Sequence, residues 1–150
     1  MTHISSEQTM KAFGQHIGSL LHGGEVIELV GDVGAGKTTF VKGLALGLDI
    51  DEDIQSPSFT ISRTYDARDD LRLVHYDFYR LDDAGIMKAE LQESVNDTGV
   101  VTVIEWADIA SDVLPNSRLT LQIIPTSETE REVTVSPVGD RAEIIAGTLV

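Results

Sequence analysis

The sequence predicts a three-layer α/β fold whose mixed sheet has a parallel core and antiparallel hairpin additions. A strand-like segment, residues 25–30, leads through a glycine-rich turn into a helical segment, residues 39–45, as in a βαβ unit. Residues 100–104 are apolar almost throughout, which is typical of a strand that is covered on both faces. Residues 119–123 and 132–135 alternate around a polar turn and predict a terminal hairpin.

A helix is predicted before the first strand. Ser5 and Gln8 stand at capping-box spacing and mark its start, and the two glycines at 23–24 mark its end. The apolar residues that recur at helical spacing between these points are Met10, Phe13, Ile17 and Leu20.

The middle of the chain predicts a second hairpin, with strands over 59–63 and 71–77 and a turn over 66–70. Arg72 and His75 interrupt the apolar residues of its second strand, so we expect that strand to be half exposed and antiparallel. The remaining elements that the pattern predicts are short helices over 87–95 and 107–114 and a final strand over 142–146.

The length and composition indicate one globular domain. A chain of 150 residues can build one α/β domain with a substantial core but not two, so residues 1–150 are expected to form a single domain. The absence of cysteine excludes disulfides and thiolate metal sites and agrees with a cytoplasmic location. No apolar run reaches the length of a membrane span, and we expect no membrane association.

The chain is strongly acidic, with 11 basic and 25 acidic residues and a net charge of −14. Such a surface repels DNA and RNA over most of its area, whereas a nucleotide meets only one local site. If the protein serves a nucleic-acid pathway, we therefore expect a partner to hold the nucleic acid. The simpler interpretation, that the charge keeps the protein soluble, stays open.

Residues 31–38, G-D-V-G-A-G-K-T, match the phosphate-binding motif G-x-x-x-x-G-K-[ST] in full and lie between the predicted strand and helix. Glycines let successive N–H groups turn toward a phosphate, and the helix N-terminus adds its partial positive charge. Lys37 would contact the β- and γ-phosphates, and Thr38 would bind Mg²⁺. The fold is therefore expected to be P-loop NTPase-like. The candidate nucleotide-binding residues in this loop are Asp32, Val33, Gly34, Ala35, Gly36, Lys37, Thr38 and Thr39.

A P-loop enzyme also needs an acidic residue at the end of a neighbouring core strand, which holds Mg²⁺ directly or through water. Asp77 and Glu105 each follow a predicted strand. The strand before Glu105 is the more apolar and better suits the buried position beside the P-loop, which favours Glu105 as the Mg²⁺-linked acid. Asp77 would then polarise or orient the attacking water. Without the P-loop, either residue would pass for an ordinary strand-end carboxylate.

Four segments stand out together: residues 31–40, 56–60, 75–81 and 104–106, which contain the P-loop, S-P-S-F-T, H-Y-D-F-Y-R-L and I-E-W. In this combination they resemble the TsaE (YjeE) family of bacterial P-loop ATPases. The P-loop is shared by a very large class of proteins, but the order S-P-[ST]-[FY]-T, D-x-Y-R-L and E-W is far more specific. Ser58 stands where the family often has threonine, and the hydroxyl is kept.

The resemblance implies a role in making threonylcarbamoyladenosine beside the tRNA anticodon. Family members bind ATP with Mg²⁺, hydrolyse it slowly alone, and act with the TsaB–TsaD pair that transfers the threonylcarbamoyl group. The expected ligands are therefore ATP, ADP and Mg²⁺, and the expected partners are homologues of TsaD and TsaB. The resemblance implies that tRNA is met only through that complex, and we expect no DNA binding.

Carried over by position, the resemblance assigns phosphate and Mg²⁺ binding to Lys37 and Thr38. It links Glu105 to Mg²⁺ and gives Asp77 a part in hydrolysis, so that Lys37, Asp77 and Glu105 form the expected catalytic set. Trp106 is expected beside the nucleotide pocket. The segment that resembles a switch near the γ-phosphate contains Ser56, Ser58 and Thr60.

Several of these residues also have purely structural interpretations. Ser58 and Thr60 would serve equally well as caps of a strand, and a lone tryptophan such as Trp106 is more often simply buried. His75 is interpreted as a strand residue and not as a ligand. Two arginines are candidates for binding phosphate or a partner's acidic residue: Arg63 and Arg80.

A small-molecule kinase on the same fold is the main alternative function. Kinases of this size normally carry a mobile segment rich in arginine or lysine, whereas residues 82–98 hold Lys88 as their only basic residue. A GTPase switch is disfavoured because the chain has no N-K-x-D motif for guanine. A non-catalytic module that binds a nucleotide and signals through a partner differs little from a slow ATPase.

Overall fold

A computed structural model of the chain describes residues 1–57, 60–83, 85 and 87–149. The longest of its helices, α1, has 13 residues, and no helix in these ranges is long and apolar enough to cross a membrane. Two short 3₁₀ helices, Arg68–Asp70 and Ala107–Ala110, lie between the main elements. In chain order the main elements are β1 (Thr2–Ile4), α1 (Glu7–Ser19), β2 (Val26–Val30), α2 (Lys37–Gly47), β3 (Ser62–Asp66), β4 (Arg72–Asp77), α3 (Met87–Asn96), β5 (Val100–Glu105), β6 (Arg118–Pro125), β7 (Arg131–Val138) and α4 (Asp140–Thr148).

The strands form one mixed sheet in the order β1-β7-β6-β2-β5-β4-β3. Its centre is parallel, because β2 pairs in parallel with β5 and β6, and β5 pairs in parallel with β4. The edges are antiparallel: β3 pairs with β4 on one side, and β6, β7 and β1 follow one another on the other side. The predicted parallel core with antiparallel hairpin additions is confirmed.

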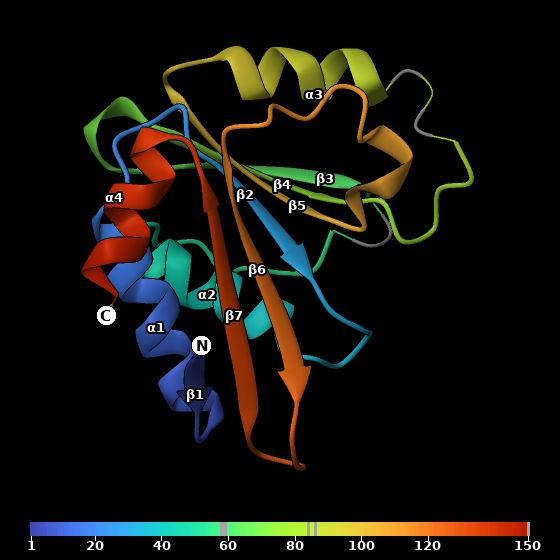
Figure 1. Ribbon diagram of the computed structural model, residues 1–150. Coiled ribbons are helices and arrows are strands. Elements are labelled where there is room, and N and C mark those ends of the chain that lie inside the picture. The colour runs from blue at the N-terminus through green and yellow to red at the C-terminus, as the bar shows by residue number, and fades with distance from the viewer. Residues whose placement is uncertain (58–59, 84, 86, 150) are drawn as a thin grey trace.

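Helices lie on both sides of the sheet and make three layers (Figure 1). On one side, α1, α2 and α4 cover a core that includes Ile17, Phe40 and Ile145. On the other side, α3 and the loop after β5 cover a smaller core around Tyr76 and Leu91. The parallel strands at the centre therefore carry apolar residues on both faces, as parallel sheets normally do.

The helix that carries the P-loop is held in place by a close crossing with α1. Glycines line this crossing on both helices, and a β-carbon added at Gly43 would lie 2.2 Å from the carbonyl oxygen of Lys11. A β-carbon at Gly14 would lie 2.4 Å from the carbonyl oxygen of Phe40. The backbones of α1 and α2 are thus in contact, which fixes the position of α2 against the sheet.

The structure corrects the expectation for β4. This strand is buried from Leu73 onward and pairs in parallel with β5, although it pairs antiparallel with β3 as predicted. The expectation was wrong because His75 was taken as a sign of solvent exposure, whereas its ring is buried against a carboxylate of β5. A polar residue in a strand can lie on a solvent-exposed face, but it can equally be buried in a hydrogen bond with another side chain.

The C-terminal segment is also different from the prediction. Residues 142–146 were expected to form a strand but lie within the helix α4. Ala142 and Ile145 are buried, three residues apart, and Arg141 pairs with Glu25 at 3.1 Å. This i, i+3 burial is helical periodicity, which a segment of five residues is too short to reveal.

Smaller differences concern element boundaries. Ser6, and not Ser5, caps α1 by accepting a hydrogen bond from the Thr9 amide, and α1 ends at Ser19, before the two glycines. The helix expected over 107–114 is a single 3₁₀ turn. The strand expected to begin at residue 59 begins at Ser62; Phe59 lies outside the described residues. The short strand β1 was not predicted.

Candidate functional site

The P-loop lies between a strand and a helix, as its sequence predicts. It follows β2 and enters α2 directly, with positive φ angles of 84° at Gly34 and 110° at Gly36. A β-carbon at Gly34 would meet no atom within 4 Å, so this glycine is required by its backbone conformation and not by lack of space. The turn therefore depends on glycine for the shape that can surround a phosphate.

A cavity of about 350 Å³ lies beside this loop. The P-loop and the start of α2 form one wall, and the ends of β4 and β5 form the other. The two strand ends meet there because β4 and β5 are parallel and Asp77 is paired with Glu105 in register. The residues that line the cavity are Val33, Gly34, Gly36, Lys37, Thr38, Thr39, Ser56, Asp77, Tyr79, Arg80, Glu105 and Trp106.

Lys37 is folded back into its own loop. Its side chain is only 6% exposed, and Nζ donates a hydrogen bond to the carbonyl oxygen of Gly31 at 2.7 Å. The same ammonium lies 3.6 Å from Oε1 of Glu105 and 4.3 Å from the centre of the Trp106 ring. A carboxylate and an aromatic face both stabilise a cation that has little contact with water.

Glu105 is held from a second side by His75. The ring nitrogen Nε2 of His75 lies 2.5 Å from Oε2 of Glu105, and the histidine is fully buried. The sequence interpretation of His75 as a strand residue is correct but missed this contact. Once β4 is placed parallel to β5, the alternation of side chains along a strand turns His75, like Asp77, to the face of the P-loop helix.

Asp77 is almost as buried as Glu105, with exposed fractions of 5% and 3%. Its Oδ1 accepts a hydrogen bond from the amide of Tyr79 at 3.0 Å, and its own amide donates to the carbonyl of Ile61 at 2.9 Å. These contacts anchor the point at which β4 ends, so the carboxylate reaches the cavity from a fixed backbone.

Trp106 has a left-handed backbone conformation with φ of 56°. Its ring is partly buried, and its centre lies 4.9 Å from that of the half-exposed Tyr79 ring, with the two planes tilted by 47°. Trp106 is thus partly buried and also lines the cavity beside the P-loop; its place beside a nucleotide stays a prediction. Tyr79 and Arg80 also line the cavity. The D-F-Y-R segment therefore contributes further residues to this site besides Asp77.

Some of the predicted residues do not lie in this cavity. Asp32 lines a different one, Ala35 is buried, and its carbonyl accepts a hydrogen bond from Arg131 at 2.8 Å. Thr60 is exposed in a turn, where its amide donates to the carbonyl of Pro57 at 3.1 Å. Ser58 lies outside the described residues, so of the predicted switch-like group only Ser56 is found in the cavity wall.

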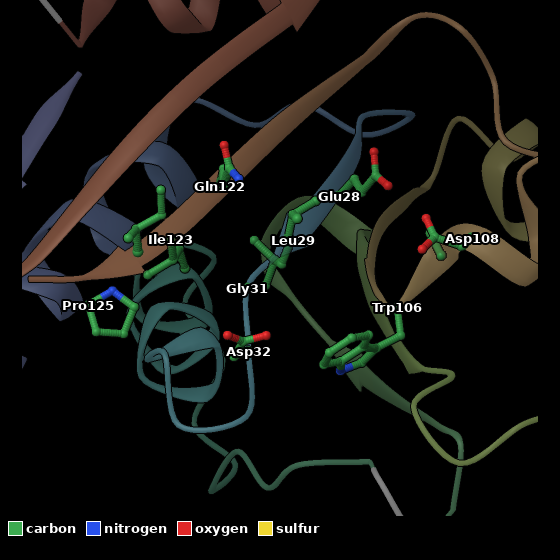
Figure 2. Close-up of a pocket in the computed structure, with 12 residues that line it drawn as sticks. Glu28, Leu29, Gly31, Asp32, Trp106, Asp108, Gln122, Ile123 and Pro125 are labelled. Carbon is green, nitrogen blue, oxygen red and sulfur yellow. The ribbon is translucent and has the colours of Figure 1, made fainter.

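Two further cavities border the P-loop. One, of about 250 Å³, is shown in Figure 2: Trp106 and Asp108 lie on one side of it, and Ile123 and Pro125 of β6 lie on the other. The second, of about 290 Å³, shares Gly34, Gly36 and Thr39 with the 350 Å³ cavity beside the P-loop. It is otherwise lined by Ser6, Glu7, Met10, Glu128, Thr129 and Arg131.

The side-chain oxygens that this cavity offers to a metal ion include those of Thr38 and Glu105. The described residues contain no group of three or more His, Asp or Glu side chains that could hold a metal ion. Mg²⁺ commonly takes only one or two protein oxygens together with water and substrate phosphates. Thr38 and Glu105 face one cavity and could supply those oxygens.

A family model and the sequence relatives of this chain point to the same protein family. The model of the family described as "Threonylcarbamoyl adenosine biosynthesis protein TsaE" matches residues 4–133. The tRNA threonylcarbamoyladenosine biosynthesis protein TsaE of Bacillus subtilis is 38% identical over 146 residues, which cover 97% of this chain and 90% of that protein. The protein of the same name from Treponema pallidum is 42% identical over 132 residues, 87% of this chain and 96% of that protein.

The fold agrees with these matches. The crystal structure of Bacillus subtilis YdiB superimposes with a TM-score of 0.80 and 34% sequence identity, covering 99% of this chain and 91% of that one. Family model, sequence relatives and fold thus agree over most of the chain. The chain belongs to the TsaE family of threonylcarbamoyl adenosine biosynthesis proteins.

Proposed function

We propose that this protein binds ATP with Mg²⁺, hydrolyses it slowly by itself, and acts with homologues of TsaB and TsaD in the threonylcarbamoyladenosine modification of tRNA. The observation that carries the proposal is the cavity in which the P-loop faces the two strand-end carboxylates, Asp77 and Glu105. Phosphate binding and acidic residues for Mg²⁺ and water are the two requirements of phosphoryl transfer from ATP to water.

In this proposal the phosphates occupy the turn formed by Gly34 and Gly36, and Lys37 moves from the Gly31 carbonyl to them. Thr38 and Glu105 would hold Mg²⁺, which would neutralise charge on the phosphate oxygens. Asp77 orients the attacking water and accepts its proton. Trp106 and Tyr79 cover the side of the cavity and keep bulk water away from Lys37.

The base of the nucleotide is best accommodated in the 290 Å³ cavity near Met10 and Arg131. That cavity shares Gly34, Gly36 and Thr39 with the phosphate cavity, so a nucleotide can extend from one to the other across the P-loop. Among the described residues, the cavity of Figure 2 shares only Trp106 with the phosphate cavity. Its described wall contains three acidic residues, Glu28, Asp32 and Asp108, and no lysine or arginine, whereas the 290 Å³ cavity offers Arg131 beside its acidic residues.

The kinase alternative is not favoured by any contact among the described residues. Lys88, the single basic residue of segment 82–98, pairs with Asp112 at 3.0 Å and is absent from the described wall of the cavity. The hydrogen bond from Lys88 lowers the pKa of the Asp112 carboxyl. Lys88, at the start of α3, is thus directed toward the surface.

The test is ATP hydrolysis by this chain alone, and again with the TsaB and TsaD homologues and tRNA of the same organism. We expect strong stimulation by the complex, lost in Lys37→Ala and kept in Lys42→Ala. Lys42 is the matched control because it is an exposed lysine of the same helix. If the chain neither binds the complex nor responds to it, the proposal is wrong, and small-molecule phosphate acceptors would be screened instead.

A further inference from the structure

The buried histidine of β4 has no role in the function proposed above. We propose that His75 is a positioning residue, which holds the Glu105 carboxylate in the orientation that binds Mg²⁺. The inference rests on the proposed function, because it assumes that Glu105 contacts the metal. It concerns a residue that touches neither the nucleotide nor the metal itself.

The sheet forces the two residues together. β4 and β5 are parallel neighbours in which His75 is paired with Val103 and Asp77 with Glu105. Side chains two residues apart point to the same face of a strand, so His75 lies beneath the side chain of Glu105. No solvent reaches the ring, since His75 is fully buried.

The hydrogen bond has a defined direction. A carboxylate oxygen only accepts, so Nε2 of His75 carries the proton that lies between it and Oε2 of Glu105, 2.5 Å away. The other ring nitrogen, Nδ1, is buried without a hydrogen-bond partner among the described residues. Within this part of the chain, the polar contact of the ring is therefore directed at Glu105.

A buried imidazole with an unpaired nitrogen is less favourable for stability than an apolar side chain of similar size. Its presence in the centre of the sheet therefore calls for a reason other than packing. The position of Glu105 supplies one. His75 binds Oε2, while Oε1 lies 3.6 Å from Nζ of Lys37, a residue that lines the same cavity as Glu105.

This arrangement divides the two oxygens of Glu105 between two tasks. When Lys37 turns to the phosphates, Oε1 loses its nearest cation and becomes available to Mg²⁺. Oε2 stays bound to His75, so the carboxylate keeps its direction and does not have to be ordered by the metal. Hydrogen bonds of this kind to metal-binding carboxylates typically change metal affinity by roughly tenfold to a hundredfold.

The experiment compares His75→Met with His75→Gln. Methionine and glutamine have similar length and shape, but only glutamine offers an N–H near the position of Nε2. Binding of ADP is followed by the fluorescence of Trp106, the single tryptophan of the sequence, while Mg²⁺ is titrated. We expect His75→Met to raise the Mg²⁺ midpoint roughly tenfold to a hundredfold, to leave metal-free ADP binding unchanged, and to be largely rescued in His75→Gln.

Two further variants separate positioning from a general loss of stability. Thr102→Val removes another fully buried polar contact of β5, the 2.7 Å hydrogen bond to Ser94, and should leave the Mg²⁺ midpoint unchanged. Glu105→Ala should abolish most of the Mg²⁺ dependence. In the Glu105→Ala background, His75→Met should have no additional effect on the midpoint, because its effect passes through the carboxylate.

The outcomes distinguish the two levels of the proposal. If ADP binding by the wild type does not depend on Mg²⁺, the metal role of Glu105 is wrong and the inference falls with it. If Glu105→Ala loses the dependence but His75→Met keeps the wild-type midpoint, only the role of His75 is wrong. Should the His75 variants not fold, ¹⁵N NMR of the wild type still decides. A slowly exchanging Nε2 proton that shifts in Glu105→Gln supports the contact, and an unchanged signal overturns it.

Discussion

Nζ of Lys37 lies 2.7 Å from the carbonyl oxygen of Gly31, the first residue of the motif that Lys37 belongs to. The lysine side chain is thus folded back against its own loop, and its Nζ lies 4.3 Å from the centre of the Trp106 ring. A nucleotide phosphate would offer the ammonium a stronger, charged partner than a carbonyl. Binding of a nucleotide should therefore move Lys37 away from the indole and change the surroundings of Trp106.

From this follows a prediction for nucleotide binding. Addition of ADP should change the emission of Trp106, the single tryptophan of the chain. Lys37→Met should lower ADP affinity by roughly 10- to 150-fold, because a hydrogen bond to a charged group contributes about 1.5–3 kcal/mol. The measurement is a fluorescence titration, with calorimetry as an independent check of affinity.

Lys42→Met is the control for that titration. It removes the same charge from an exposed position of α2, so any loss caused by net charge alone would appear in both variants. Equal affinities in Lys37→Met and Lys42→Met would mean that the P-loop lysine does not bind the phosphates.

A second prediction separates hydrolysis from binding at Asp77. In the wild type the Tyr79 amide donates a hydrogen bond to Oδ1 of Asp77 at 3.0 Å. Asp77→Asn keeps an oxygen that can accept this bond but removes the charge that would attract a proton from water. We expect hydrolysis to fall by roughly 10²- to 10⁴-fold while ADP affinity changes little. Single-turnover ATP hydrolysis measures the first and a binding titration measures the second.

Asp108→Asn is the comparison for Asp77→Asn, because Asp108 is an exposed acid beside the cavity of Figure 2 and outside the described wall of the P-loop cavity. It should hydrolyse ATP at the wild-type rate. A wild-type rate in Asp77→Asn itself would remove Asp77 from the reaction and leave Glu105 as the acid that handles water.

The parts of the site that could be predicted from sequence are the local ones. The P-loop is a run of eight residues with its strand and helix on either side, so its conformation depends on neighbours in the chain. Glu105 could be favoured because its strand is apolar almost throughout, which indicates burial beside the P-loop strand. The pairing of β5 with β2 confirms that position. The roles assigned to Lys37, Thr38 and Glu105 stay predictions.

The parts that could not be predicted depend on contacts between distant residues. The burial of β4 follows from His75 meeting Glu105, thirty residues later in the chain, and a polar residue gives no sign of its partner. The helix α4 is short, and the apolar pattern of the five residues 142–146 fits a strand as well as a helix. The crossing of α1 and α2 depends on Gly14 and Gly43 matching across two helices.

A third prediction concerns the stability of that crossing. Alanine at Gly43 would place a β-carbon 2.2 Å from the Lys11 carbonyl oxygen, so α1 would have to move. We expect a loss of about 1–3 kcal/mol in the free energy of unfolding, even though alanine favours a helix. Gly147→Ala in α4 meets no atom within 4 Å and should raise stability slightly. Urea unfolding of both variants tests the crossing; a gain in both would mean that α1 and α2 separate readily.

The last prediction concerns alkaline pH. Burial against α3 raises the pKa of the Tyr76 hydroxyl to about 12 from 10.0. In the unfolded chain the hydroxyl ionises near pH 10, so between pH 10 and 12 the unfolded state holds fewer protons than the folded state, and stability falls as the pH rises. The loss should be roughly 1 kcal/mol at pH 11. Urea midpoints at pH 9 and 11 should therefore differ less in Tyr76→Phe than in the wild type, whose other titrating groups the variant retains. An equal fall in both proteins would show that Tyr76 ionises as readily in the folded chain as in the unfolded one.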